Sequence, residues 1–262
     1  MLTENPVFSD LCRAFPLAQY AGWPAPDELS RWLNPDYGYR FTDSADLAAD
    51  GRYYEAYIYE TRQIPTRLQN WHDLFGALIW CLFPATKQLL NRLHQHEIAQ
   101  HGLKQRSILR NKLTLLDECG VILACEPGMA EHIGSLQQHC WHQVFWQNRH
   151  IWWQTVRPVI FGHAIYEMAT RPFLGLTAKC WFVEVPAGFC QWPVTDAYTF
   201  LDEKLSKQIA DGSALLDNQQ LTPLPLLGVP GWYNDNQHAD FYNNTDYFRP
   251  LRLKTGPLND RN

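Results

Sequence analysis

A histidine and a glutamate stand four residues apart in a largely apolar stretch of the sequence, at His163 and Glu167. If this stretch is helical, that spacing puts both side chains on one face. Such a pair can act as general acid and base, or can supply two ligands to a divalent metal. A buried hydrogen bond that fastens two helices would use the same residues. Because a buried neutral imidazole needs a partner for each ring nitrogen, we expect Glu167 to supply one partner of His163 and His72 or Asp73 to supply the other.

His72 and Asp73 form a second candidate pair, in the first turn of a predicted helix. They could act as a base and its orienting carboxylate, or as metal ligands that join His163 and Glu167. A carboxylate in the first turn also complements the helix dipole. A purely structural role for Asp73 therefore stays open.

Two adjacent carboxylates, Asp117 and Glu118, fall in a predicted hairpin turn between the β-type runs 113–116 and 121–125. Paired carboxylates can bind a metal or share a proton, although acidic residues are also common in turns. Arg110 lies upstream and could neutralise one of them. We count all three as candidate ligand-binding residues.

Other residues suit a planar or anionic ligand. Trp146 and Arg149 share a face of a predicted aromatic helix over 141–153, which could stack a base or a sugar unless it is buried. The stretch 104–112 could hold a phosphate or an RNA backbone, or could be a solvated loop. Its four cations, with no acid among them, are Lys104, Arg106, Arg110 and Lys112.

The elements that must position these residues form an irregular series of helices and short strands. Apolar spacing and capping residues predict helices over 70–83, 85–101, 127–138, 141–153, 157–170 and 195–210. Short β-type runs predict strands over 53–60, 113–116, 121–125 and 179–185. Because helices and strands do not alternate regularly, we predict a helix-rich single α+β domain with a small, mostly antiparallel sheet.

We expect the domain to cover residues 51–252, with residues 1–50 as an arm packed on it and 253–262 as a frayed tail. The segment 223–232 alternates proline with large apolar residues. Proline cannot continue a helix and favours extended backbone. This segment is therefore predicted to form an extended, Pro-rich C-terminal arm that packs on the core.

Composition excludes several classes of protein. Of the 262 residues 46% are hydrophobic and 19% charged, which is incompatible with a disordered chain. The net charge of −5 provides no global field for nucleic acid, although a local basic patch stays open. The sequence has no secretory signal and no membrane-length apolar run, so we expect a cytoplasmic protein. Its seven cysteines form no C-x-x-C pair, so neither a disulfide framework nor a zinc ribbon is indicated.

Several short segments, taken together, resemble a bacterial family catalogued as domain of unknown function 3025. They are NWHDLF at 70–75, LTLLDE at 113–118, FGHA at 161–164, PLP at 223–225 with LGVPGW at 227–232, and FRP at 248–250. The family pattern has an asparagine where this chain has Gly76, so a site that uses the asparagine would be altered here. The resemblance implies a soluble bacterial protein and brings no activity, cofactor or catalytic residue.

Three classes of function fit these observations. The first is a hydrolase or group-transfer enzyme that acts on a small molecule or nucleotide through His163, Glu167, His72 and Asp73, with or without a divalent metal. The second is a module that binds RNA, a nucleotide or another planar ligand without catalysis. The third is a structural or assembly protein. Convergence of the four polar side chains in one pocket would favour the first class.

Overall fold

The computed structural model describes residues 2–20, 22–212 and 221–251. Within these ranges the α-helices are α1 Ser9–Ala14, α2 Pro26–Ser30, α3 Ser44–Asp50, α4 Tyr54–Thr61, α5 Trp71–Leu82, α6 Pro84–His101, α7 Ile108–Cys119, α8 Ala130–Gln137, α9 His163–Ala169 and α10 Val194–Ala210. The strands are β1 Arg40–Asp43, β2 Gln63–Thr66, β3 Gly120–Cys125, β4 Val156–Ile160, β5 Thr177–Glu184 and β6 Thr222–Pro225. The tail predicted over 253–262 lies outside the described residues.

The chain is a single α+β domain, as predicted, and its main sheet is mixed. The strand order is β4-β3-β5-β6. Strand β3 pairs antiparallel with β4 and parallel with β5, and β5 pairs antiparallel with β6. A separate parallel pair joins β1 to β2. Every residue of β3 is buried, as expected for the centre of a covered sheet.

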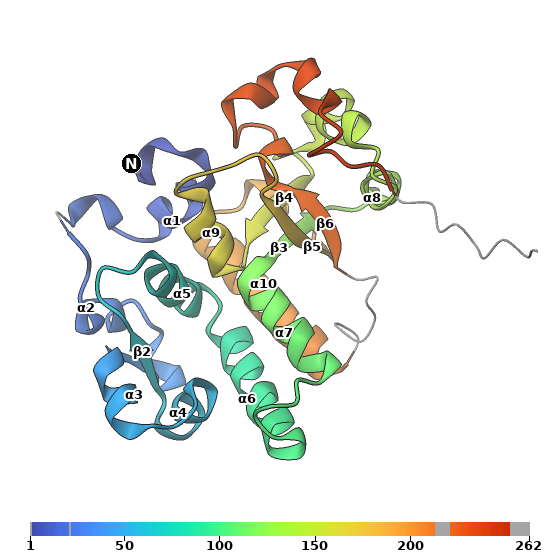
Figure 1. Cartoon of the computed structure of the whole chain (residues 1–262). Helices are drawn as coiled ribbons and strands as arrows, with labels where there is room; N and C mark the ends of the chain where they lie inside the picture. The colour runs from blue at the N-terminus through green and yellow to red at the C-terminus, as the bar shows by residue number, and fades with distance from the viewer. Residues whose placement is uncertain (1, 21, 213–220, 252–262) are drawn as a thin grey trace, which may run out of the picture.

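The long helices pack against one another and the sheet. Figure 1 shows α6, α7 and α10 below the four-stranded sheet, with the C-terminal segment above it and α8 beside it. Helix α9 packs against both α5 and α7. These contacts bring together segments that lie far apart in the sequence.

Several predicted elements are confirmed with their ends. Asn70 caps α5, where its side chain accepts a hydrogen bond from the backbone N–H of Asp73 at 3.0 Å. Helix α6 ends at His101, directly before Gly102 as predicted, and α10 and β5 lie within a few residues of their predicted ranges. Local capping and apolar spacing therefore determine these elements.

Other predicted elements are wrong. Residues 53–60 are predicted as a strand but form most of helix α4. The predicted hairpin over 113–125 is instead helix α7 followed directly by strand β3, so Asp117 and Glu118 lie in the last turn of a helix. The predicted helix over 157–170 begins only at His163, because its first residues form β4. Proline is tolerated at Pro158 because β4 is an edge strand.

The segment 223–232 and the N-terminal segment both contribute buried side chains to the core. Residues predicted as an extended arm over 223–232 begin within strand β6 and continue as a 3₁₀ turn at Leu226–Gly228. Leu224, Leu227 and Val229 are buried. Near the N-terminus, Val7, Phe8 and Leu11 are buried in the same core.

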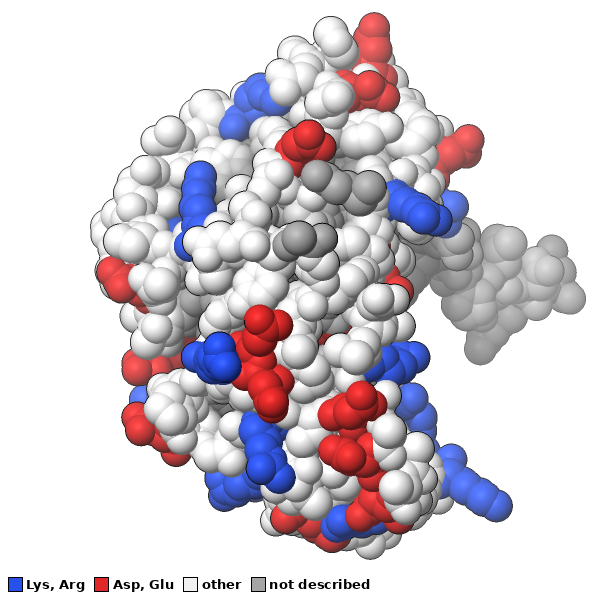
Figure 2. All heavy atoms as spheres, turned by 90° about the vertical axis from the view of Figure 1, so that its left-hand side faces the viewer, with Lys and Arg blue, Asp and Glu red and all other residues white. Residues whose placement is uncertain are grey.

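None of the helices in the described ranges is long and apolar enough to cross a membrane. On the face shown in Figure 2, acidic and basic side chains are interspersed, and the upper part of that face is mostly uncharged. This face therefore presents no broad basic surface.

Candidate metal centre

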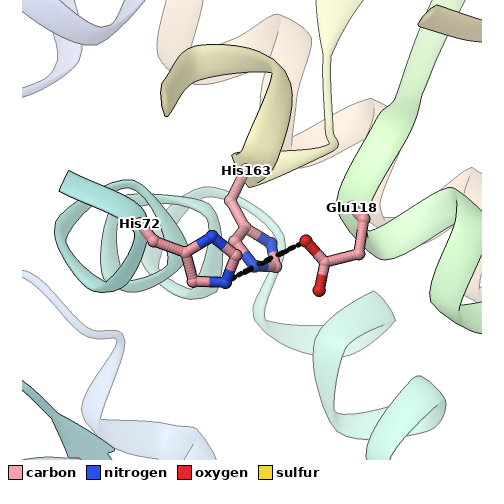
Figure 3. A group of neighbouring side chains, drawn as sticks. All are labelled: His72, Glu118 and His163. Atoms are coloured by element: carbon pink, nitrogen blue, oxygen red, sulfur yellow. Dashed lines mark hydrogen bonds and ion pairs between the residues drawn. The ribbon is translucent and has the colours of Figure 1, made fainter. Parts of the chain in front are cut away.

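Three helices direct His72, Glu118 and His163 toward one point. His72 lies in the first turn of α5, Glu118 in the last turn of α7, and His163 at the first position of α9 (Figure 3). The Nε2 atoms of the two histidines are 3.0 Å apart. Oε2 of Glu118 lies 3.4 Å from Nε2 of His163 and 3.9 Å from Nε2 of His72. Two imidazole nitrogens and one carboxylate oxygen thus form a compact triangle.

The dimensions of this triangle match those of a zinc site. Ligand atoms at the corners of a tetrahedron around zinc lie about 3.3–3.4 Å apart, since each is about 2.0–2.1 Å from the ion. A point equidistant from the three atoms lies about 2.0 Å from each of them. The separations of the three atoms are therefore compatible with ligation of one divalent ion.

Glu167 holds His72 rather than His163. Its Oε2 is 2.9 Å from Nδ1 of His72, so the expected contact between Glu167 and His163 is wrong. His163 begins its helix, and its Nε2 meets His72, the partner from another segment that the sequence predicts. A carboxylate on the second nitrogen of a metal-binding histidine is the usual arrangement in zinc proteins, because it fixes the tautomer.

Gly162 allows α9 to begin directly against the end of α7. Its N–H and that of Phe161 both donate to the carbonyl of Gly120, at 2.8 and 3.0 Å. A Cβ at position 162 would lie 2.5 Å from the backbone oxygen of Glu118. Only glycine fits such an approach, which places His163 beside Glu118.

The protonation of these groups follows from their surroundings. His163 is 7% exposed, and burial lowers its pKa to about 4, although the charge of Asp117 acts in the opposite direction. The neutral imidazole that results is the form that binds a metal. Burial and the charge of Asp117 raise the pKa of Glu118. A bound cation would favour its ionised form.

Asp117 and Asp73 are near the triangle but are occupied by cations. Asp117 accepts from Nζ of Lys87 at 2.5 Å, so Lys87 and not Arg110 neutralises it. Asp73 accepts from Nε and Nη2 of Arg67 at 3.0 and 2.8 Å. Burial raises the pKa of Asp73, but these hydrogen bonds and the charge of Arg67 hold it below its ordinary value. Both carboxylates are therefore held in ion pairs.

A cavity of about 520 Å³ opens beside the triangle, and all three candidate ligands line it. Glu55 of α4 and Asn91 of α6 line it too, and the amide of Asn91 donates to the Glu55 carboxylate at 2.6 Å. Burial raises the pKa of Glu55 to about 7, although the hydrogen bond from Asn91 acts in the opposite direction. The cavity thus contains both a candidate metal site and a carboxyl group that can exchange protons near neutral pH.

Position 76 faces the same site. Gly76 follows His72 by one helical turn, and a Cβ there would lie 3.7 Å from Cδ2 of His163. This is an ordinary contact distance, so a small side chain would fit. Any residue at this position would therefore reach the ring of a candidate ligand.

The remaining candidates lie elsewhere. Arg149 stacks over Trp146 at 5.2 Å and donates to the backbone oxygen of Asn236, and neither residue lines the cavity. The predicted helix around them is instead a π turn at Gln143–Gln147 and a 3₁₀ turn at Arg149–Ile151. Arg110 is buried and donates to backbone carbonyls of the loop before α7.

Sequence patterns missed several residues that line the cavity, among them Lys87, Glu55 and Asn91. Lys87 and Asn91 are four residues apart on the correctly predicted helix α6, so one face of that helix carries two polar groups among buried leucines. That pattern could have identified them. Glu55 gave no signal, because the segment that contains it is predicted as a strand.

Comparison with known proteins identifies a family but no activity. A family model described as "Protein of unknown function (DUF3025)" matches residues 39–252. No curated protein and no solved structure gives a significant match.

Proposed function

The chain belongs to the DUF3025 family of proteins of unknown function, and we propose that it is a metal-dependent hydrolase whose ion is held by His72, Glu118 and His163. The observation that carries this proposal is the convergence of Nε2, Nε2 and Oε2 within 3.9 Å beside a cavity. Catalytic zinc has three protein ligands and keeps a fourth position for water or substrate. Two histidines and one glutamate are one of the ligand sets that such sites use.

The ligand set favours zinc over harder cations. Imidazole nitrogen suits zinc, copper, iron and nickel, whereas magnesium and calcium prefer sites made entirely of oxygen ligands. Two histidines and one carboxylate also serve iron(II) oxygenases. Metal analysis and activity without oxygen separate the two chemistries, because hydrolysis consumes water and needs no oxidant.

A divalent ion held by His72, Glu118 and His163 would supply a Lewis acid that lowers the pKa of a water molecule in the cavity. Glu55 would accept a proton from this water while the water oxygen forms a bond to the electrophilic carbon or phosphorus of the substrate, and the bond to the leaving group would break. Protonated Glu55 then returns the proton to the leaving group, which restores the carboxylate.

The surroundings of Glu55 support this role. The residue is half-buried at the cavity wall, Asn91 holds its carboxylate, and its pKa of about 7 suits proton transfer in both directions near neutral pH. A side chain held by a neighbouring amide is already oriented before substrate binds. Such preorganisation is typical of catalytic acids and bases.

Two observations weigh against the nucleic-acid alternative. Trp141, Phe145 and Trp152 are buried, so the aromatic segment offers no exposed row of rings for stacking bases. In the basic stretch 104–112, Lys104 and Arg106 are exposed whereas Arg110 and Lys112 are buried. The buried rings and buried cations therefore favour an enzyme over a module that binds nucleic acid.

Zinc binding by matched variants tests the proposal. We expect the purified chain to bind one zinc ion, and His163→Gln to lower zinc affinity at least about a hundredfold, since it removes one ligand. His94→Gln is the control, because His94 is a buried histidine that lines the same cavity outside the triangle. Affinity is measured by competition with a chromophoric chelator, and circular dichroism checks that each variant is folded. Equal losses in both variants, or no stoichiometric binding, would contradict the proposal.

Hydrolysis provides the second test. We expect the zinc-loaded protein to hydrolyse members of a panel of carboxylic and phosphoric esters. Glu55→Gln should lower kcat by about 10²–10⁴-fold while zinc affinity stays unchanged. Activity of Glu55→Gln equal to that of the original chain would exclude Glu55 as the proton acceptor.

A further inference from the structure

Arg106 is a cation at the cavity wall with no carboxylate partner among the residues that the structure describes. The other two cations of the wall are paired, Arg67 with Asp73 and Lys87 with Asp117. The guanidinium of Arg106 donates to the hydroxyl of Thr114 on α7, and the residue is otherwise exposed. Most of its hydrogen-bond donors are therefore free to bind a ligand.

The loop that carries Arg106 has an ordered support. Buried Arg110 donates from Nη1 to the carbonyls of Gly102, Leu103 and Gln105, at 3.3–3.4 Å. Arg110 thus ties the loop to helix α7 from inside. Arg106 follows the last of these carbonyls directly, so its backbone is held in place.

Arg106 also reaches the face of α7 that carries the candidate ligand Glu118. Its partner Thr114 and the ligand Glu118 are four residues apart on α7, so they share a face with Cβ atoms about 5–6 Å apart. Both line the cavity. Burial lowers the pKa of His94, another residue of the wall, to about 4, and the charge of Asp117 opposes this shift. The charges of Lys87, Arg110 and Arg106 add to the lowering, with Arg106 the smallest of the three contributions.

The charged residues of the cavity wall, together with a divalent ion, would attract an anion. Once the two ion pairs are set aside, the charged groups that remain are Glu55, Glu118 and Arg106. A divalent ion at Glu118 would make the sum of these charges positive. An anionic ligand would then meet a net attractive field.

We propose that Arg106 binds an anionic group of the substrate, a carboxylate or a phosphate, placed about one helical turn from the bond that is cleaved. This inference rests on the proposed metal-dependent hydrolase and specifies its substrate class. Guanidinium groups bind both anions through paired hydrogen bonds. The substrate would thus contact the protein at two points, the metal and Arg106.

Binding of short dicarboxylates tests this arrangement. Glutarate can place one carboxylate on the metal and the other near Arg106, whereas butyrate offers only one. We expect Arg106→Gln to weaken glutarate binding to the zinc-loaded protein by about ten- to a hundredfold, as for loss of a charged hydrogen bond. Butyrate binding should not change. Calorimetry measures both, and 4-phosphonobutyrate in place of glutarate shows whether carboxylate or phosphate is preferred.

Lys104→Gln is the matched control, because it removes the same charge from the same loop outside the cavity wall. We expect it to leave glutarate affinity unchanged, and Arg106→Lys to restore part of the affinity. Equal losses in Lys104→Gln and Arg106→Gln, or glutarate affinity that Arg106→Gln leaves intact, would overturn the proposal. If either result is obtained while zinc binds normally, only the proposed anion subsite is contradicted and the proposed metal site is not. If zinc does not bind the original chain, the metal-dependent hydrolase fails and the subsite fails with it.

Discussion

Glu167 accepts a hydrogen bond from Nδ1 of His72, and this contact determines which nitrogen of His72 is free. With the Nδ1 proton held by the carboxylate, Nε2 keeps its lone pair and points toward Nε2 of His163. The same contact prevents rotation of the ring. In the proposed metal site, Glu167 would therefore position His72 without itself being a ligand of the ion.

Replacing Glu167 by glutamine should weaken metal binding without removing a ligand. We expect Glu167→Gln to lower zinc affinity by about 10–100-fold, because the amide is a weaker acceptor and polarises the ring less. Chelator competition measures the change. Glu131→Gln, which removes an exposed carboxylate on α8, is the control and should leave zinc affinity unchanged. Equal affinities in the original chain and Glu167→Gln would contradict the positioning role.

Four of the candidate residues do converge, and the sequence explains part of this. The spacing of four residues predicts that His163 and Glu167 share a helix face, and the predicted first turn of another helix adds His72 together with Asp73. Glu118 was singled out for a different reason, as half of an acidic pair. Its placement opposite the histidines depends on how α7 and α9 pack, and no local pattern contains that contact.

At the scale of elements, one glycine joins two helices at the site. A Cβ on Gly162 would lie 2.5 Å from the oxygen of Glu118, 2.5 Å from the nitrogen of Gly120 and 2.6 Å from the nitrogen of Cys119. All three are backbone atoms, which cannot move aside independently. Any side chain at 162 must therefore push the start of α9 away from the end of α7.

Gly162→Ala should destabilise the fold and the metal site together. We expect the free energy of unfolding to fall by about 1–3 kcal/mol, as for an overpacked core, and zinc affinity to fall because His163 moves away from Glu118. Urea unfolding and zinc titration measure the two effects. Gly134→Ala is the control, because a Cβ there meets no atom within 4 Å inside α8. It should raise stability by about 0.5–1 kcal/mol and leave zinc binding unchanged.

The wrongly predicted hairpin shows what local patterns can and cannot determine. Leu109, Leu113 and Leu116 recur at helical spacing, and this signal could have identified α7. The run after Gly120 is a true strand, so the element changes type without a loop. The turn-forming residues Asp117 to Gly120 predict a hairpin from the sequence. In the structure they mark the end of helix α7. The sequence of helix α4 predicts a strand because a short run rich in tyrosine, with Ile58 among the tyrosines, suits a strand as well as a short, half-buried helix.

At the scale of the whole molecule, the sequence is enough to predict the fold class but predicts only part of the candidate site. The irregular order of helices and strands is enough to predict an α+β domain. The site joins positions 72, 118 and 163, which are distant in sequence and meet through packing of α5, α7 and α9. Side-chain convergence over such separations depends on tertiary contacts, which one sequence does not contain.

Burial of histidine also makes the stability of the whole protein depend on pH. His132 on α8 is 4% exposed, and neither ring nitrogen has a hydrogen-bond partner among the described residues. Burial, together with the charge of His150, lowers its pKa to about 4, below the value of about 6.5 for an unfolded chain. Above pH 6.5 the ring is neutral in both states. Between pH 6.5 and 4 the unfolded chain takes up a proton that the folded protein does not, so stability falls as pH falls.

His132→Leu should remove this part of the acid sensitivity. For a pKa shifted from about 6.5 to about 4, the linked loss at pH 5 is about 2 kcal/mol relative to pH 7. We therefore expect the difference in free energy of unfolding between pH 7 and pH 5 to shrink by about that amount in His132→Leu, as measured by urea unfolding at both values. His96→Gln, which changes an exposed histidine, is the control and should leave the difference close to that of the original chain. An undiminished difference in His132→Leu would mean that the ring is protonated in the folded protein. It would then require a polar partner for His132 that the described residues do not supply.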